Sequence, residues 1–388
     1  MVSTRDSIEL ELDELKKNNL YRKPQTVEVY GAKVLVDGVE KIHLCSNDYL
    51  GLSRNPQVIE EARATLDHMS QCSSRLVAGN SPKLLELEEQ IAKHRHTEAS
   101  LIYPSGYMAN LGVITALANK DTAIFSDELN HASIIDACRL SRATIKVFRH
   151  NDIEDLNGLL RSTTSNRIVV TEGIFSMDGD FSVLDQICRL VKEYNAIIIV
   201  DDAHGDFIFG SPGSYSGVPA YFDVNEMIDV NVSSLSKGLG CFGGYVACSK
   251  LARELLVNKS RQFIYTSALP EHLCAAALAA VPVAQNGNLQ GMLFRNVAFF
   301  YKKLKDLGFS IARSTSQIMP VMIGDEKLAL EFSNELSRNG VFVQPIRYPT
   351  VMKGKARLRV TITALHDKND LQTAVDSFEM VGKKRNVI

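Results

Sequence analysis

The chain has 388 residues, which is too long for one simple core and predicts a large domain and a smaller one. A formal net charge of −2 argues against a nucleic-acid-binding protein, and no apolar run reaches the length of a membrane span. The seven scattered cysteines form no CxxC pair, and the N-terminus lacks a signal peptide's basic-then-apolar order. We therefore expect a cytoplasmic protein with reduced thiols, no nucleic-acid partner and no metal site.

The first 50 residues predict an N-terminal arm and a hairpin. Residues 1–20 alternate acidic residues with leucines, which indicates an amphipathic helix or arm. Residues 33–45 read as two short strands, with Asp37 and Gly38 at the turn between them.

Residues 51–285 alternate between apolar runs and helical patterns, which predicts a large α/β domain. Expected strands are 99–103, 122–126, 145–148, 167–171, 196–201, 228–235 and 244–248. Expected helices among them are 105–118, 132–142, 152–161 and 184–194. This alternation is typical of a mostly parallel sheet between helices, with the ligand beyond the carboxyl ends of the strands.

From residue 286 the pattern changes to that of a smaller α+β domain, 286–388. A long helix is followed by short strands near 317–323, 341–345 and 356–362 and by a closing helix from about 367.

Lys237 follows an apolar segment and precedes Gly238, Gly240, Gly243 and Gly244. An amine at a strand end beside glycines can lie close to a ligand, although a solvated surface lysine is the simpler interpretation. The glycines also match the GxGxxG pattern of dinucleotide-binding proteins. They do not open the first βαβ unit of the chain, and no acidic residue follows at the required spacing, so we reject that interpretation.

Asp201 ends a buried strand and is followed by His204. A buried carboxylate costs several kcal/mol unless it meets a cation. A protonated pyridine nitrogen would be such a cation, and a cap on the following turn is an equal alternative.

Three more predicted strand ends carry polar side chains. Ser105 begins a helix whose free N–H groups suit a phosphate, or it is a plain N-cap. His131 could stack on a flat ring, and Ser176 follows the strand at 167–171. With Asp201 and Lys237 these residues form a constellation that predicts one site.

Ten motifs in chain order resemble the α-oxoamine synthases, which are fold-type I enzymes that use pyridoxal 5′-phosphate (PLP). They are SerAsnAspTyrLeuGlyLeu (46–52), SerSerArgLeuValAlaGlyAsn (73–80), SerGlyTyrMetAlaAsn (105–110), LeuAsnHisAlaSerIleIleAsp (129–136), HisAsnAsp (150–152), PheSerMetAspGlyAsp (175–180), ValAspAspAlaHisGly (200–205), SerLeuSerLysGlyLeuGly (234–240), TyrThrSerAlaLeuPro (265–270) and GlyLysAlaArgLeuArgValThr (354–361). The resemblance spans nearly the whole chain and implies the PLP-dependent transferase fold type I.

The resemblance implies that Lys237, His131, Asp201 and His204 are the catalytic residues. Lys237 would form the imine with PLP and act as base and acid at the substrate α-carbon, while Asp201 would pair with the pyridinium nitrogen. His131 would stack on the ring, and Ser176 and His204 would contact its 3-oxygen. The phosphate contacts would come from Ser105, Gly106, Tyr107 and Ser234.

Other matched residues imply a shared site and substrate contacts. Thr266 and Ser267 match residues that reach the phosphate of the neighbouring subunit's cofactor, so we expect a homodimer with shared active sites. Arg359 matches the arginine that binds the amino-acid carboxylate, a group that suits a guanidinium fork. Asn47 would lie near the substrate, and Arg22 stands where an N-terminal arginine is expected to contact the acyl chain.

The implied reaction condenses a small amino acid with an acyl-CoA and releases CoA and CO₂. The motifs are most similar to the branch that joins L-alanine to a pimeloyl thioester in the biotin pathway. The glycine C-acetyltransferase branch is the alternative, followed by 5-aminolevulinate synthase and serine palmitoyltransferase. Transamination stays open as another PLP reaction. A non-catalytic PLP-fold subunit is the alternative from a different class, but such chains typically lose the lysine that this one keeps.

Three positions depart from the family pattern. MetSerGlnCys (69–72) replaces a glycine-rich run, Leu84 replaces a common histidine, and Met352 replaces a common proline. The first two belong to the family's substrate entrance, so acyl groups other than pimeloyl stay open.

Overall fold

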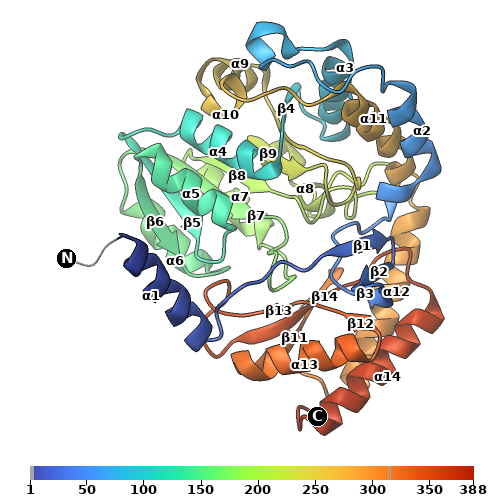
Figure 1. Ribbon diagram of the computed structural model, residues 1–388. Coiled ribbons are helices and arrows are strands. Elements are labelled where there is room, and N and C mark those ends of the chain that lie inside the picture. The colour runs from blue at the N-terminus through green and yellow to red at the C-terminus, as the bar shows by residue number, and fades with distance from the viewer. Residues whose placement is uncertain (1–3, 313, 315) are drawn as a thin grey trace. The chain divides into compact units, whose positions relative to one another are not determined.

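The structure is a computed structural model that describes residues 4–312, 314 and 316–388. The chain divides into two compact units, each described here by itself (Figure 1). Unit 1 comprises 1–46, 177–179 and 292–388, and unit 2 comprises 47–176 and 180–291. Of the helices in the described ranges, none is long and apolar enough to cross a membrane.

Unit 2 is built on a seven-stranded sheet in the order β4-β10-β9-β8-β7-β5-β6. Only β10 runs antiparallel to its neighbours. The strands are β4 (Ala99–Tyr103), β5 (Thr122–Asp127), β6 (Thr144–Phe148), β7 (Asn166–Glu172), β8 (Ile197–Asp201), β9 (Val230–Ser234) and β10 (Gly244–Cys248). All seven predicted runs form strands, and the mostly parallel sheet is confirmed.

Helices pack against this sheet because apolar residues fill both sides of its central strands (Figure 1). Val170, Ile199 and Val232 lie in one buried cluster with Val113 of α4 and Ile134 of α5. The helices are α2 (Pro56–Ala64), α3 (Pro82–His94), α4 (Gly106–Leu117), α5 (Ala132–Ser141), α6 (Ile153–Arg161), α7 (Leu184–Glu193), α8 (Val218–Tyr221), α9 (Lys250–Lys259), α10 (Arg261–Ile264) and α11 (Glu271–Gln285). A π-helical turn spans Arg75–Gly79.

The glycine-rich segment after Lys237 is the turn between antiparallel strands β9 and β10. Gly240 and Gly243 have φ of +60° and +126°, values that side chains disfavour. A Cβ at Gly238 would lie 2.6 Å from the Asp206 carbonyl oxygen. No helix follows β9 here, so the segment lacks the strand–turn–helix setting that a dinucleotide fingerprint requires.

A buried cluster of charges holds the loop that follows β8. Arg95 Nη1 donates to Asp202 Oδ2 at 2.9 Å and to Asp206 Oδ1 at 3.0 Å, and its Nη2 donates to Asn231 Oδ1 at 2.6 Å. His94 Nε2 lies 2.8 Å from the same Asp206 oxygen. Burial opposes charge on Asp206, but Arg95 and His94 outweigh it and lower its pKa to about 2. The loop after β8 is thereby tied to the end of α3 and to β9.

Asp202 lies in a cradle of glycines. A Cβ would lie 2.5 Å from its Oδ1 at Gly173, 2.3 Å from the same atom at Gly205, and 1.7 Å from Oδ2 at Gly217. Burial raises the pKa of Asp202 to about 7 despite the Arg95 charge. The carboxyl therefore fits only because these three positions lack side chains.

Unit 1 contains the N-terminal arm, the hairpin and the C-terminal α+β elements. Asp37 and Gly38 have positive φ, as a two-residue hairpin turn requires, so the predicted hairpin is confirmed. β1 and α13 were not predicted. β1 is exposed throughout, and α13 begins one residue after β11, with Asp325 as its N-cap. The elements are α1 (Thr4–Lys17), β1 (Val27–Tyr30), β2 (Lys33–Val36), β3 (Val39–His43), α12 (Asn288–Asp306, whose first residues fall in unit 2), β11 (Ile318–Gly324), α13 (Glu326–Arg338), β12 (Val341–Phe342), β13 (Pro345–Ile346), β14 (Ala356–Thr361) and α14 (Lys368–Lys384).

His150 of the HisAsnAsp motif lies between two carboxylates of unit 2. Its Nδ1 is 3.0 Å from Asp127 Oδ1, and its Nε2 is 2.8 Å from Asp180 Oδ2. Burial disfavours the imidazolium, but these two hydrogen bonds and charges raise the pKa of His150 to about 10. The charged His150 ring links the end of β5 to the segment after Phe175. It packs against the Phe175 ring in a T-shaped arrangement.

We predict that Arg95→Met lowers the free energy of unfolding by about 3–5 kcal/mol, because two buried carboxylates lose their cation. Arg189→Met is the matched control, since that guanidinium is 72% exposed in its ion pair and should contribute under about 1 kcal/mol. Urea unfolding of the full chain measures both. Equal losses in the two variants would contradict a special role for Arg95.

A second prediction concerns pH. Because the folded-state pKa of His150 is raised to about 10 from 6.5, its stabilising contribution is complete below pH 6.5 and is lost as pH rises through 10. The stability difference between the wild type and His150→Gln should therefore be constant at acid pH and shrink between these values. Urea midpoints at pH 6, 8 and 10 measure it; a difference that grows with pH would refute the assignment.

Candidate active site

Lys237 ends in a chain of hydrogen bonds beyond the carboxyl ends of β8 and β9. Its Nζ lies 2.9 Å from His204 Nε2, and the hydroxyl of the fully buried Tyr49 lies 2.6 Å from His204 Nδ1. Tyr49 also donates to Asn47 Oδ1 at 3.1 Å. The amine is thus held by an imidazole whose other nitrogen is fixed by a phenol.

Asp201, the last residue of β8, accepts a hydrogen bond at each oxygen. Ala203 N–H donates to Oδ1 at 3.1 Å, and Asn110 Nδ2 donates to Oδ2 at 2.6 Å. Asn110 lies on α4 and is buried. Both contacts hold the carboxylate plane in one orientation at the sheet edge.

His131 caps the start of α5, where its Nδ1 accepts from Ser133 N–H at 3.2 Å. Burial lowers the pKa of His131, and the Lys237 charge adds to this while Asp201 acts in the opposite direction. The imidazole is therefore neutral near pH 7, with Nδ1 as acceptor. Tyr107 meets this ring edge-on, with centroids 6.3 Å apart.

The start of α4 lies against the end of β9. Ser105 is its N-cap and accepts from Met108 N–H at 3.2 Å, and the first N–H groups of a helix have no acceptor within it. A Cβ at Gly106 would lie 3.3 Å from Ser234 Cβ, so the two predicted phosphate-binding segments are adjacent. Helix polarity and these N–H groups favour an anion here.

Glu172, opposite Asp201 in the pairing of β7 with β8, was missed from the sequence. Burial raises the pKa of Glu172 well above its usual value, and the Asp201 charge adds to this effect. Burial and the Asp201 charge thus both favour the protonated form of Glu172. Tyr49, Asn110 and Ser133 were also assigned no role, although each belongs to a quoted motif, which was the available signal.

The remaining predicted residues lie in several places. Ser176 follows β7 and is buried; Thr266 is half-buried, and Ser267 is exposed in unit 2. Ser267 pairs with Ser74 in an isolated β-bridge. Arg22 and Arg359 belong to unit 1, where Arg359 is a buried residue of β14.

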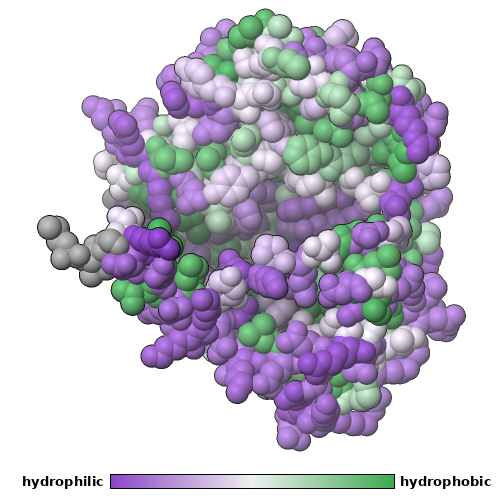
Figure 2. All heavy atoms as spheres, in the orientation of Figure 1, coloured by the Kyte–Doolittle hydropathy of each residue, from purple (hydrophilic) through white to green (hydrophobic). Residues whose placement is uncertain are grey.

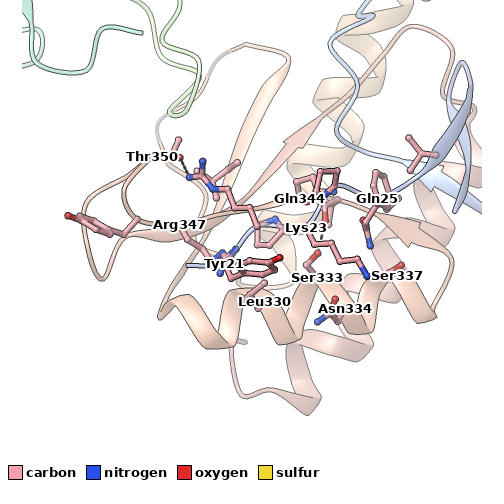
Figure 3. A pocket seen from close by; sticks show the side chains of 18 residues that line it. Tyr21, Lys23, Gln25, Leu330, Ser333, Asn334, Ser337, Gln344, Arg347 and Thr350 are labelled. Atoms are coloured by element: carbon pink, nitrogen blue, oxygen red, sulfur yellow. Dashed lines mark hydrogen bonds between the residues drawn. The ribbon is translucent and has the colours of Figure 1, made fainter. Parts of the chain in front are cut away.

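Arg22 lines a pocket of about 770 Å³ that lies within unit 1 (Figure 3). Lys23 and Arg347 also line it, and its lining residues include neither Asp nor Glu. Arg22 donates to Thr350 Oγ1 at 3.2 Å. Burial lowers the pKa of the Arg347 guanidinium and the Arg22 charge lowers it further, while the Glu326 charge, which lies outside the lining, acts in the opposite direction. Two cations that repel each other in one pocket favour an anionic ligand.

The residues of unit 2 fit PLP. Lys237 supplies an amine for the aldehyde, and Asp201 supplies a carboxylate for the pyridine nitrogen. His131 supplies a neutral imidazole for the ring face. The start of α4 with Ser234 suits a phosphate. A Cβ at Gly244 would lie 2.3 Å from Gly106 N, so glycine at this position lets β10 pack closely against the start of α4.

Comparisons with known proteins agree with this chemistry. A sequence model described as aminotransferase class I and II matches residues 39–378. The 8-amino-7-oxononanoate synthase of Thermoanaerobacter pseudethanolicus is 42% identical, covering 99% of this chain and 98% of that protein. Two similar solved structures are serine palmitoyltransferase from S. paucimobilis with bound PLP (28% identity, TM-score 0.93, 100% of both chains) and 8-amino-7-oxononanoate synthase from Francisella tularensis (25%, 0.76, 89% of this chain and 99% of that chain).

These matches span almost the whole chain, and they agree with the observed fold. The expected fold type I and the use of PLP are confirmed. The chain belongs to the aminotransferase class I and II family and, within it, to the PLP-dependent α-oxoamine synthases, which are acyltransferases.

Proposed function

We propose that this protein is an 8-amino-7-oxononanoate synthase, which condenses L-alanine with a pimeloyl thioester and releases CO₂ and CoA. Relatives of that name match at 38–42% identity over nearly the full chain. The observation that carries the reaction class is the hydrogen bond between the Lys237 amine and His204, on the loop that directly follows Asp201.

The residues that would hold PLP are those around Lys237. Lys237 would bind it covalently, Asp201 would pair with its ring nitrogen, and His131 would lie against its ring. Ser176 and His204 would contact its 3-oxygen. The phosphate would be bound by Ser105, Gly106, Tyr107 and Ser234. When bound, PLP supplies an electron sink for negative charge at the substrate α-carbon.

Once the substrate amine is bound, Lys237 is the base that removes the α-proton and the acid that returns it. His204 supports this role because its Nε2 can hold the Lys237 amine 2.9 Å away, oriented by the Tyr49 hydroxyl on Nδ1. Arg359 would bind the alanine carboxylate through its guanidinium fork, and Asn47 would lie near the substrate. Loss of that carboxylate as CO₂ follows carbon–carbon bond formation.

The pocket of unit 1 favours an acyl group that ends in a carboxylate. Arg22, Lys23 and Arg347 are all among its lining residues, which include neither Asp nor Glu. A pimeloyl or succinyl chain carries a terminal carboxylate, whereas acetyl and palmitoyl chains do not. Charge at this pocket therefore supports the dicarboxylic donors over the glycine C-acetyltransferase and serine palmitoyltransferase alternatives.

We also propose that the protein is a cytoplasmic homodimer whose two subunits share their active sites. Large apolar residues lie exposed in unit 2 at Met69 (72%), Val77 (82%) and Tyr265 (71%). Figure 2 shows hydrophobic side chains on the face of unit 2 around α2 and α3. Thr266 and Ser267 directly follow Tyr265, and they would reach the phosphate of the cofactor bound to the partner.

We predict that borohydride fixes PLP onto Lys237 in the wild type, because it reduces the C=N bond between Lys237 and the cofactor to a stable secondary amine. Lys237→Ala should bind PLP reversibly and carry no label, which peptide mass spectrometry measures. Lys250→Ala, which removes an exposed lysine of α9, is the control and should label normally. A label on another lysine would refute the assignment.

We predict that alanine with pimeloyl-CoA gives the fastest thiol release when alanine, glycine and serine are crossed with acetyl-, succinyl-, pimeloyl- and palmitoyl-CoA. Arg347→Leu should raise KM for pimeloyl-CoA about 10- to 100-fold, the loss of one charge-assisted contact, and leave acetyl-CoA turnover nearly unchanged.

The control for this assay is Arg338→Leu, which makes the same change at an exposed position of α13 outside the pocket lining. A preference for glycine with acetyl-CoA, or for serine with palmitoyl-CoA, would overturn the proposed substrates while leaving the reaction class intact.

A further inference from the structure

Asn110 joins the two side chains that address a bound pyridine ring. Its Nδ2 group donates to Asp201 Oδ2 at 2.6 Å and to Ser133 Oγ at 2.9 Å. Ser133 Oγ lies 2.8 Å from His131 Nδ1. A continuous chain of hydrogen bonds therefore runs from the carboxylate of β8 through α4 and α5 to the imidazole.

The chemistry of the groups gives this chain a direction. An amide Nδ2 only donates, so Ser133 Oγ must accept from Asn110 and can turn its own proton toward His131 Nδ1. Ser133 N–H also donates to that nitrogen at 3.2 Å. With two donors on Nδ1, the neutral ring carries its proton on Nε2.

Burial gives this arrangement a free-energy cost, because it leaves one oxygen of Asn110 unpaired. Asn110 and Ser133 are each 1% exposed, and Asn110 Oδ1 is buried with no hydrogen-bond partner among the described residues. An apolar side chain of similar size would avoid this unpaired oxygen, but it would remove the amide donor of Asp201 Oδ2 and Ser133 Oγ. The cost of the amide is offset only by its two donated bonds.

We propose that Asn110 is a positioning residue that sets the Asp201 carboxylate and the His131 imidazole relative to each other for binding PLP. One group addresses the ring nitrogen and the other the ring face. Because both groups are held through the Asn110 amide, the angle and the spacing between them are fixed. A binding site needs such positions to be held within about 0.5 Å.

The first test reads the His131 ring directly in the full-length protein with ¹⁵N-labelled histidine, with and without PLP. In the wild type, NMR shifts should show the Nε2–H form. Asn110→Leu and Ser133→Ala should each increase the Nδ1–H form, because Nδ1 loses its hydroxyl donor or the partner that orients it. Unchanged shifts in both variants would overturn the proposal.

The second test is a double-mutant cycle on the PLP dissociation constant, measured by quenching of protein fluorescence. Asn110→Leu should raise the constant about 10- to 100-fold, the equivalent of one charge-assisted hydrogen bond. Asn110→Leu with Ser133→Ala should raise it by less than the product of the single effects, because both act through one chain. Multiplicative effects would overturn the coupling.

Asn296→Leu is the control for a general loss of stability. Asn296 belongs to unit 1, and its Nδ2 donates to the carbonyl oxygens of Thr363 and His366 at 3.1 and 2.8 Å. This variant should lose stability without changing the His131 shifts or the PLP dissociation constant. If it shifts either readout as much as Asn110→Leu does, Asn110 acts only as a packing residue. Ser133→Ala, which removes one hydroxyl, keeps the test valid if Asn110→Leu fails to fold.

Discussion

A single buried guanidinium constrains much of unit 2. Arg95 is 2% exposed, and it satisfies its charge with Asp202, Asp206 and the amide of Asn231. An unpaired charge at such depth costs several kcal/mol, so the end of α3, the loop after β8 and strand β9 must meet in one arrangement. That loop directly follows Asp201, the last residue of β8, and carries His204. The position of the site therefore depends on how the Arg95 charge is neutralised.

The turn that carries Lys237 is supported by the same loop. Gly238 approaches the Asp206 backbone so closely that a Cβ would lie 2.6 Å from the carbonyl oxygen. Lys237 therefore lies on one turn, and His204 and Asp201 lie at another that packs closely against it. Reactive groups held in this way need little reorganisation when a ligand binds, which is the usual source of catalytic efficiency.

The sheet, the hairpin and helices such as α4, α5, α6 and α7 could be predicted because each depends on local patterns: apolar runs, capping residues and an AspGly turn. β1 could not, since its four residues are exposed and show no alternation of burial. The residues around Lys237 were named through motifs, whereas the partners of His204 and Asp201 were not. Tyr49 lies 155 positions from His204, and Asn110 lies 91 positions from Asp201. Hydrogen bonds between residues so far apart in the sequence form only in the folded chain, so no rule based on residue spacing predicts them.

The glycine cradle around Asp202 has an evolutionary consequence. Gly173, Gly205 and Gly217 come from three separate segments, yet each tolerates no side chain while the carboxyl is present. Replacing Asp202 first would remove one of the two carboxylates that neutralise Arg95, and replacing a glycine first would bring its side chain into collision with the carboxyl. Descendants of this sequence can leave the arrangement only by several simultaneous changes, so these five positions should be inherited as a block even while the surrounding surface diversifies.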